Sequence, residues 1–144
     1  MLNIVIGGTV EKSAMIRMSL VQLGVQLFQQ HPILGIGIDN PRLYTYGIVG
    51  ESYYLHNNFV EILSSGGIVG IVIYYWIYVK LLLSYIKRRN FDDPQYCICL
   101  VLLILLLIMD YGMVSYYSKS TYMFLLIFVL FDKSLRLSHD EGGK

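Results

Sequence analysis

The sequence predicts an all-α integral membrane protein with about three transmembrane helices, preceded by an external amphipathic helix and a loop. Three observations support this fold class. Hydrophobic residues make up 56% of the 144-residue chain, and its mean hydropathy is +0.56. Charged residues make up only 15%, whereas roughly a quarter of the residues in soluble domains are charged. The apolar runs are long and are separated by short polar turns, as in polytopic proteins.

Charge and cysteine content exclude several functional classes. The net charge of +1, from 11 basic and 10 acidic residues, leaves no surplus to hold a nucleic acid. Cys97 and Cys99 are two residues apart in an apolar segment, so on a helix they point about 200° apart and are predicted to be packing residues. No phosphate loop, nucleophile elbow or metal motif is present in the sequence, so no cofactor is expected.

The amino-terminal third is predicted to be a leader followed by an amphipathic helix. Residues 1–12 begin with an apolar stretch too short to cross a bilayer, and form either a leader or the end of a truncated helix. A helix is predicted from an N-cap at Ser13 to Gln30, where Pro32 disfavours its continuation. Its apolar face consists of Ile16, Leu20, Leu23 and Leu27.

A loop is predicted after this helix. Gly35 and Gly37 allow a tight connection, and no helical or strand period persists from Asp39 to Tyr54. The predicted helix and loop together make one segment, residues 13–57, and the distribution of basic residues described below places it outside the cytoplasm. Its tyrosines suit either a surface near lipid headgroups or a face that stacks on sugars; they are Tyr44, Tyr46, Tyr53 and Tyr54.

Residues 58–132 are predicted to form a segment of three transmembrane helices. The first begins near His56 and ends at Ile86, and the second spans residues 96–109. The third, residues 122–131, is short, so it either recruits residues 114–117 or is a thin, tilted helix. On the first helix, Gly66, Gly67 and Gly70 are expected to offer a packing surface to other helices.

The distribution of basic residues predicts the topology. The proposed inner segments, 87–95 and 132–144, hold Lys87, Arg88, Arg89, Lys133, Arg136 and Lys144. The longer outer segments, 11–57 and 110–121, hold only Lys12, Arg17, Arg42 and Lys119. By the positive-inside rule, residues 133–144 are a cytoplasmic tail. A metal site formed by the three histidines, His31, His56 and His139, is then excluded, because His139 lies across the bilayer from the other two.

Several motifs occur in a suggestive order. Arg17 in the external helix is followed by HPxxGxG and then by HNxxxExxxxxGxxG at the start of a transmembrane helix. The motif residues are His31, Pro32, Gly35, Gly37, His56, Asn57, Glu61, Gly67 and Gly70. This arrangement, over roughly residues 13–131, resembles the C-terminal part of the O-antigen ligase and O-antigen polymerase superfamily of bacterial integral membrane proteins. Those relatives have many more helices, so the resemblance implies a fragment of a larger polytopic fold in the bacterial cytoplasmic membrane. The chain would be a C-terminal fragment, a truncated reading frame, or one piece of a split protein whose partner supplies the missing helices.

The resemblance also implies a reaction. A glycan would move from a polyprenyl diphosphate carrier to a hydroxyl of a glycan or lipid acceptor during cell-surface polysaccharide assembly. Arg17 and Arg42 would stabilise the leaving diphosphate, and His56 would be the base. Asn57 and Glu61 are assigned to substrate binding, and the remaining motif residues to structure.

Each assignment has an alternative. Arg17 could contact lipid phosphates. Glu61 could orient the histidine, pair with an arginine or be a solvated carboxylate in the first turn of a helix. His56 could cap the following helix, as Asn57 or Asn58 could. His31 is expected to end the preceding helix. The alternative functions are a non-catalytic accessory subunit of polysaccharide assembly or export, and an inactive truncated remnant.

Overall fold

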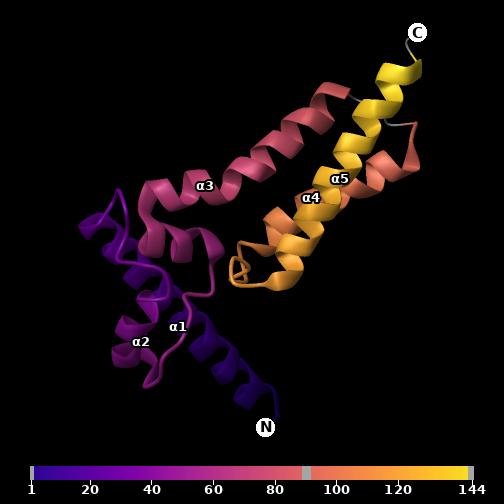
Figure 1. The fold of residues 1–144 in the computed structure, drawn as a ribbon. Coiled ribbons are helices and arrows are strands. Elements are labelled where there is room, and N and C mark those ends of the chain that lie inside the picture. Colours follow the sequence, from indigo (N-terminus) through magenta and orange to yellow (C-terminus); the bar gives the residue numbers. More distant parts are fainter. Residues whose placement is uncertain (1, 89–91, 143–144) are drawn as a thin grey trace. The chain divides into compact units, whose positions relative to one another are not determined.

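A computed structural model describes residues 2–88 and 92–142, and the side chains of residues 12–87 and 92–134. Within these residues the chain forms five α-helices and no strand, which confirms the all-helical prediction (Figure 1). The helices are α1 (Leu2–Gln30), α2 (Pro41–Val49), α3 (Asn58–Arg88), α4 (Pro94–Met109) and α5 (Lys119–Gly142). The residues and side chains of the topology prediction that lie outside the described part are Met1, Arg89 and Lys144, and the side chains of Arg88, Arg136 and His139.

The chain divides into two compact units. Unit 1 comprises Met1–Val72 with Asp110–Val114, and unit 2 comprises Ile73–Met109 with Ser115–Lys144. Helix α3 contributes its first part to unit 1 and its second part to unit 2. The motif residues named above all belong to unit 1, so the candidate site is a property of that unit.

Helix α1 begins at Leu2, so the predicted start at Ser13 is wrong. No proline interrupts the chain before Ser13, and each glycine costs a helix interior only about 1 kcal/mol, so the helix continues across the expected boundary. Its end at Gln30 confirms the effect of Pro32. Leu20 and Leu27 of the predicted apolar face are buried. This face is therefore a protein contact.

Helix α2 lies within the stretch predicted to be a loop, so that prediction is wrong for residues 41–49. Pro41 occupies the first turn, where its missing N–H removes no helical hydrogen bond. Gly50 ends the helix in the left-handed conformation (φ 78°), and its N–H donates to the carbonyl of Tyr46 at 2.9 Å. With nine residues, the helix is too short to show a clear period in the sequence.

Helix α3 is interrupted at Gly67, whose φ of 61° and ψ of −157° are restricted almost entirely to glycine. The helix changes direction there, as Figure 1 shows. In a continuous helix the N–H groups of Ile68 and Val69 would donate to the carbonyls of Ser64 and Ser65. The interruption separates these four groups.

The turn that follows α1 supplies all four missing partners. The N–H groups of Ile36 and Gly37 donate to the two displaced carbonyls, at 2.9 Å each. The two displaced N–H groups donate to the carbonyls of Pro32 and Ile33, at 2.9 and 3.2 Å. Segment 32–37 is thus inserted into the hydrogen-bond ladder of α3, and we call this arrangement the loop–helix interlock.

Glycine at two positions makes the interlock possible. A Cβ on Gly35 (φ 65°) would lie 2.4 Å from the carbonyl carbon of Ser65, and one on Gly67 would lie 2.3 Å from the carbonyl oxygen of Ile33. A Cβ on Gly70 would meet the side chain of Ile62 at 3.3 Å. Gly67 therefore packs against segment 32–37 of unit 1, and half-buried Gly70 lies beside Ile62 of the same helix.

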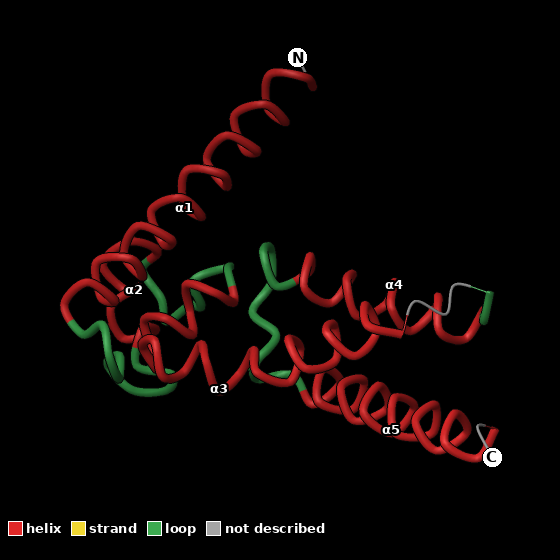
Figure 2. Tube along the Cα trace, turned by 90° about the horizontal axis from the view of Figure 1, so that it is seen from above, coloured by secondary structure: helices red, strands yellow, loops and turns green. Residues whose placement is uncertain are grey.

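Unit 2 is formed by the second part of α3 together with α4 and α5. These helices share a core of Tyr78, Leu81, Tyr85, Tyr96, Leu103, Leu125 and Phe128. Helices α4 and α5 are in contact and run alongside each other (Figure 2). The hydroxyl of Ser84 donates to the carboxylate of Asp132 at 2.5 Å, which joins α3 to α5.

One described helix, α3, is long and apolar enough over Asn58–Lys87 to cross a membrane. Helix α4 is apolar but has only 16 residues. Helix α5 begins at Lys119, so it does not recruit residues 114–117, and it continues beyond Phe131 to Gly142. The helix is therefore longer than the predicted apolar segment at both ends, and the added residues are mostly polar.

Candidate functional site

Unit 1 contains an open cavity of about 400 Å³ between α1 and the segment that joins α2 to α3. The described residues that line it are Lys12, Ser13, Ile16, Arg17, Val49, Glu51, Tyr53 and His56. Two of them, Arg17 and His56, are site residues expected from the sequence. The fold thus brings together two motif residues that are 39 positions apart in the chain.

One wall of the cavity is a single face of α1. Lys12, Ser13, Ile16 and Arg17 are spaced by one, three and four residues, so they recur at one helical turn and point to the same side. Two of these four side chains carry a positive charge at neutral pH. We call this face the cationic wall.

The opposite wall is the segment of residues 49–56. Its shape is fixed by Thr45, which is fully buried on α2. The Thr45 hydroxyl accepts a hydrogen bond from the N–H of Tyr53 at 2.8 Å, and it lies 2.9 Å from the carbonyl of Arg42, to which it donates. Because a buried hydroxyl needs hydrogen-bond partners, Thr45 holds this irregular segment in a defined position.

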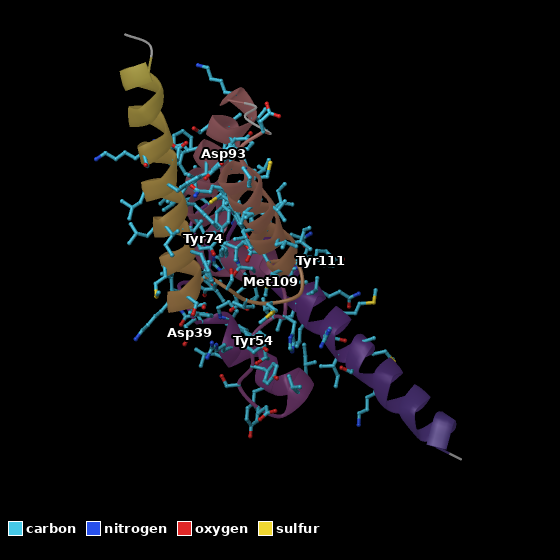
Figure 3. The ribbon with its side chains drawn as sticks, turned by 90° about the vertical axis from the view of Figure 1, so that its right-hand side faces the viewer. Asp39, Tyr54, Tyr74, Asp93, Met109 and Tyr111 are labelled. Carbon is cyan, nitrogen blue, oxygen red and sulfur yellow. The ribbon has the colours of Figure 1, made fainter. Side chains whose placement is uncertain are left out.

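His56 occupies the end of that segment in a strained backbone conformation. Its φ is 56°, in the left-handed region that residues other than glycine adopt at a cost of about 1–3 kcal/mol. The imidazole packs against two aromatic rings, with centroid distances of 5.1 Å to Tyr53 and 4.4 Å to Tyr54, which is labelled in Figure 3. These contacts hold the ring at the edge of the cavity.

The surroundings of His56 favour its neutral form. Burial lowers the pKa of the imidazole below its usual 6.5, and the positive charge of Arg17 lowers it further. The neutral ring has a nitrogen lone pair free to accept a proton at neutral pH. His56 is therefore suited to act as a base and not as a fixed positive charge.

Asn57 and Glu61, which the sequence assigned to substrate binding, are not among the residues that line the cavity. The Asn57 side chain caps α3: its Oδ1 accepts from the N–H of Val60 at 3.0 Å, and its Nδ2 donates to the carbonyl of Tyr111 at 3.1 Å. The Glu61 side chain is fully buried, and its Oε2 accepts from the N–H of Leu55 at 2.7 Å. Both residues hold the chain on either side of His56.

Arg42 and His31 also lie away from the cavity lining. Arg42 forms an ion pair with Asp39, with 2.7 Å between Nε and Oδ1. His31 is exposed at the end of α1, and its carbonyl accepts from the N–H of Gly35 at 3.0 Å.

Among the other lining residues, Lys12 and Glu51 were not candidates, and Tyr53 was named only as one of four tyrosines suited to lipid headgroups or to stacking on sugars. The helical spacing of Lys12 and Arg17 was a usable signal for the first, but the predicted helix start at Ser13 concealed it. Glu51 and Tyr53 lie in an irregular segment whose position depends on Thr45 of α2, and no local pattern in the sequence reveals that contact.

Comparison with known proteins tests the resemblance. A family model described as O-antigen ligase matches residues 2–75, just over half of the chain. The chain belongs to the O-antigen ligase family. No curated protein and no solved structure matches it. The O-antigen ligase match is shorter than the expected extent of residues 13–131, and it contains every residue that lines the cavity.

Membership of the O-antigen ligase family indicates a role in polysaccharide assembly and an association with membranes. Within the matched region, the HPxxGxG and GxxG motifs form the loop–helix interlock, and HNxxxE holds His56 in place. The motif residues thus serve one structure that ends at the cavity. Glycines and buried polar groups build it, and His56 and Arg17 face the open space.

Proposed function

We propose that this chain carries the reaction centre of a membrane glycosyltransferase of the O-antigen ligase type. The enzyme would transfer a glycan from a polyprenyl diphosphate carrier to a hydroxyl of a glycan or lipid acceptor. The observation that carries this proposal is the shared cavity: a half-buried histidine with a lowered pKa faces the same space as Arg17. The transfer needs one base and one cationic site, and these two residues supply them.

The chemistry is a displacement at the anomeric carbon of the donor sugar. The acceptor hydroxyl forms a new C–O bond to that carbon as its proton passes to the neutral imidazole of His56. The bond between the sugar and the diphosphate breaks, and its electron pair leaves with the diphosphate oxygen. Arg17 and Lys12 stabilise the added negative charge, Arg17 with two parallel N–H donors. The favourable free energy of transfer away from the diphosphate drives the reaction, so no nucleotide sugar is needed.

The surface of unit 2 supports a membrane location. Large apolar side chains are exposed along its helices, for example Ile73 (72%), Leu83 (61%) and Leu126 (58%). In water such a surface would promote aggregation, whereas lipid tails solvate it. We propose that α3, α4 and α5 are three passes of the bacterial cytoplasmic membrane, with the cavity on the outer side. We further propose that a partner protein contributes helices that help to bind the carrier lipid at the cavity.

Substitution of His56 tests the proposed function. His56→Asn tolerates the left-handed backbone, since asparagine is enriched there, but it cannot accept a proton at neutral pH. Glycan transfer in native membranes should fall by about 10²- to 10⁴-fold, the usual contribution of a general base. Protein level and membrane insertion should not change.

A second variant makes the test specific to proton transfer. His56→Gly relieves the strained backbone and leaves a space beside Tyr54, so added imidazole should restore part of the lost rate. His31→Ala is the control, because His31 is exposed and away from the cavity. Full activity of both His56 variants would show that the imidazole is structural and that the proposed role is wrong.

A further inference from the structure

The two walls of the cavity differ in chemistry. The cationic wall on α1 presents Lys12 and Arg17, whereas the opposite wall presents Glu51, Tyr53 and His56. A diphosphate bound near Glu51 would meet a negative charge of the same sign, and like charges a few ångströms apart repel strongly at an effective dielectric constant near 20. The diphosphate therefore belongs on the cationic wall. The opposite wall is left for a group with hydroxyls and no negative charge.

We propose that Glu51 and Tyr53 form the binding subsite for the acceptor saccharide. This inference rests on the proposed function, because it divides the same cavity between donor and acceptor. A carboxylate has two oxygens and accepts hydrogen bonds from two neighbouring hydroxyls of a sugar ring. A tyrosine ring covers the apolar C–H face of a pyranose, and its hydroxyl remains available as a polar contact. The pair is thus suited to a neutral sugar.

The position of this subsite relative to the base is favourable. The ring of Tyr53 lies 5.1 Å from the imidazole of His56, so a sugar stacked on Tyr53 places a hydroxyl beside the base. All three side chains come from one short segment, so the acceptor and the base are positioned together. The reacting hydroxyl would be the one that Glu51 does not hold.

The backbone of the subsite is also held in place by hydrogen bonds. The N–H of Tyr53 donates to Thr45 Oγ1 at 2.8 Å, and that oxygen lies 3.3 Å from the carbonyls of both Glu51 and Tyr53. Thr45 is completely buried, so water does not compete for these contacts. The ring of Tyr53 also stacks on Tyr54, with centroids 4.8 Å apart. A preformed subsite loses less entropy when a ligand binds.

Saccharide binding tests the inference directly. The full chain in lipid nanodiscs is mixed with the methyl glycosides of glucose, galactose, mannose, rhamnose and N-acetylglucosamine, and saturation-transfer difference NMR reports which of them bind. At least one glycoside should receive saturation. Tyr53→Ala should weaken its binding about tenfold, and Glu51→Gln should also weaken it, whereas Tyr53→Phe keeps the stacking face and most of the signal. Tyr46→Ala is the matched control, since Tyr46 is exposed on α2 and does not line the cavity.

Binding of inorganic pyrophosphate to the same samples separates this inference from the proposed function. Arg17→Ala should weaken pyrophosphate binding about tenfold, with no effect on the glycoside signal. Glu51→Gln should strengthen pyrophosphate binding, because it removes a negative charge from the cavity. Glycoside binding that is absent, or unchanged in Tyr53→Ala and Glu51→Gln, would overturn the acceptor subsite. If Arg17→Ala binds pyrophosphate as tightly as the wild-type chain, the cationic site of the proposed function is overturned instead.

Discussion

The carboxylate of Glu61 accepts a hydrogen bond from the backbone N–H of Leu55 at 2.7 Å, and both residues are completely buried. This contact reaches back from the first turn of α3 to the residue before His56. On the other side, Asn57 caps the helix and also donates to the loop at Tyr111. The strained backbone of His56 is therefore held from both ends. Asn57 and Glu61, two polar residues of one sequence motif, thus both fix the backbone on either side of His56.

Substitution of Glu61 should separate support from binding. Glu61→Ala leaves the Leu55 N–H buried without its acceptor, which costs about 1–3 kcal/mol of unfolding free energy. Glu61→Gln retains an acceptor oxygen and should lose much less. Thermal unfolding of the two variants, followed by circular dichroism, measures the difference. Equal stability of Glu61→Ala and the wild-type chain would show that the hydrogen bond between Glu61 and Leu55 contributes nothing to stability.

The loop–helix interlock gives a prediction with an adjacent control. Gly67→Ala places a Cβ 2.3 Å from the carbonyl oxygen of Ile33, in a backbone region that alanine rarely adopts. The variant should be destabilised by about 2 kcal/mol or more. Gly66→Ala meets no atom within 4 Å and should be neutral or slightly stabilising, because alanine favours the helix. The midpoints of thermal unfolding compare the two, and similar losses at both positions would contradict the interlock.

The lowered pKa of His56 predicts the pH dependence of transfer. Because the pKa of His56 is lowered, the acidic limb of kcat/KM should have its midpoint below pH 6.5, the usual value for imidazole. Arg17→Gln removes one cause of the lowered pKa, so the acidic limb should move to higher pH, whatever the change in absolute rate. A limb in the same place with and without Arg17 would show that the two side chains do not interact.

The same shift links stability to pH. The pKa of His56 is lower in the folded chain than in the unfolded chain, so the unfolded chain binds more protons between the two values. The contribution of His56 to stability is therefore complete above pH 6.5 and is lost as the pH falls through the folded pKa. His56→Asn should lose this part of the pH dependence, which unfolding curves recorded across the acidic range will show. An unchanged curve would mean that other groups carry it.

The proposed topology is tested by cysteine labelling in intact cells. In a background without Cys97 and Cys99, a cysteine at the exposed position Gly47 should react with a membrane-impermeant maleimide. A cysteine at Ser134, also exposed but proposed to lie in the cytoplasm, should react only after the cells are opened. The reverse pattern would invert the topology and place the cavity inside.

The sequence by itself determined the helical class and the end of α1. The composition and the apolar runs favour helices whatever their tertiary contacts, so they predict the helical class from the sequence alone. Pro32 ends α1 wherever the helix packs, because the steric effect of proline involves only its neighbours. The sequence also predicted Arg17 and His56 as candidate residues from their chemistry and the order of their motifs, and both line the cavity.

The tertiary structure alone decided how these parts meet. The interruption of α3 depends on contacts between distant segments, namely the hydrogen bonds from Ile36 and Gly37 to the carbonyls of Ser64 and Ser65. The same holds for Glu51 and Tyr53, which line the cavity because buried Thr45 fixes their segment. A linear pattern records the preference of each residue for its neighbours. It does not record which buried group will satisfy a hydrogen bond thirty residues away, and that pairing shapes the site.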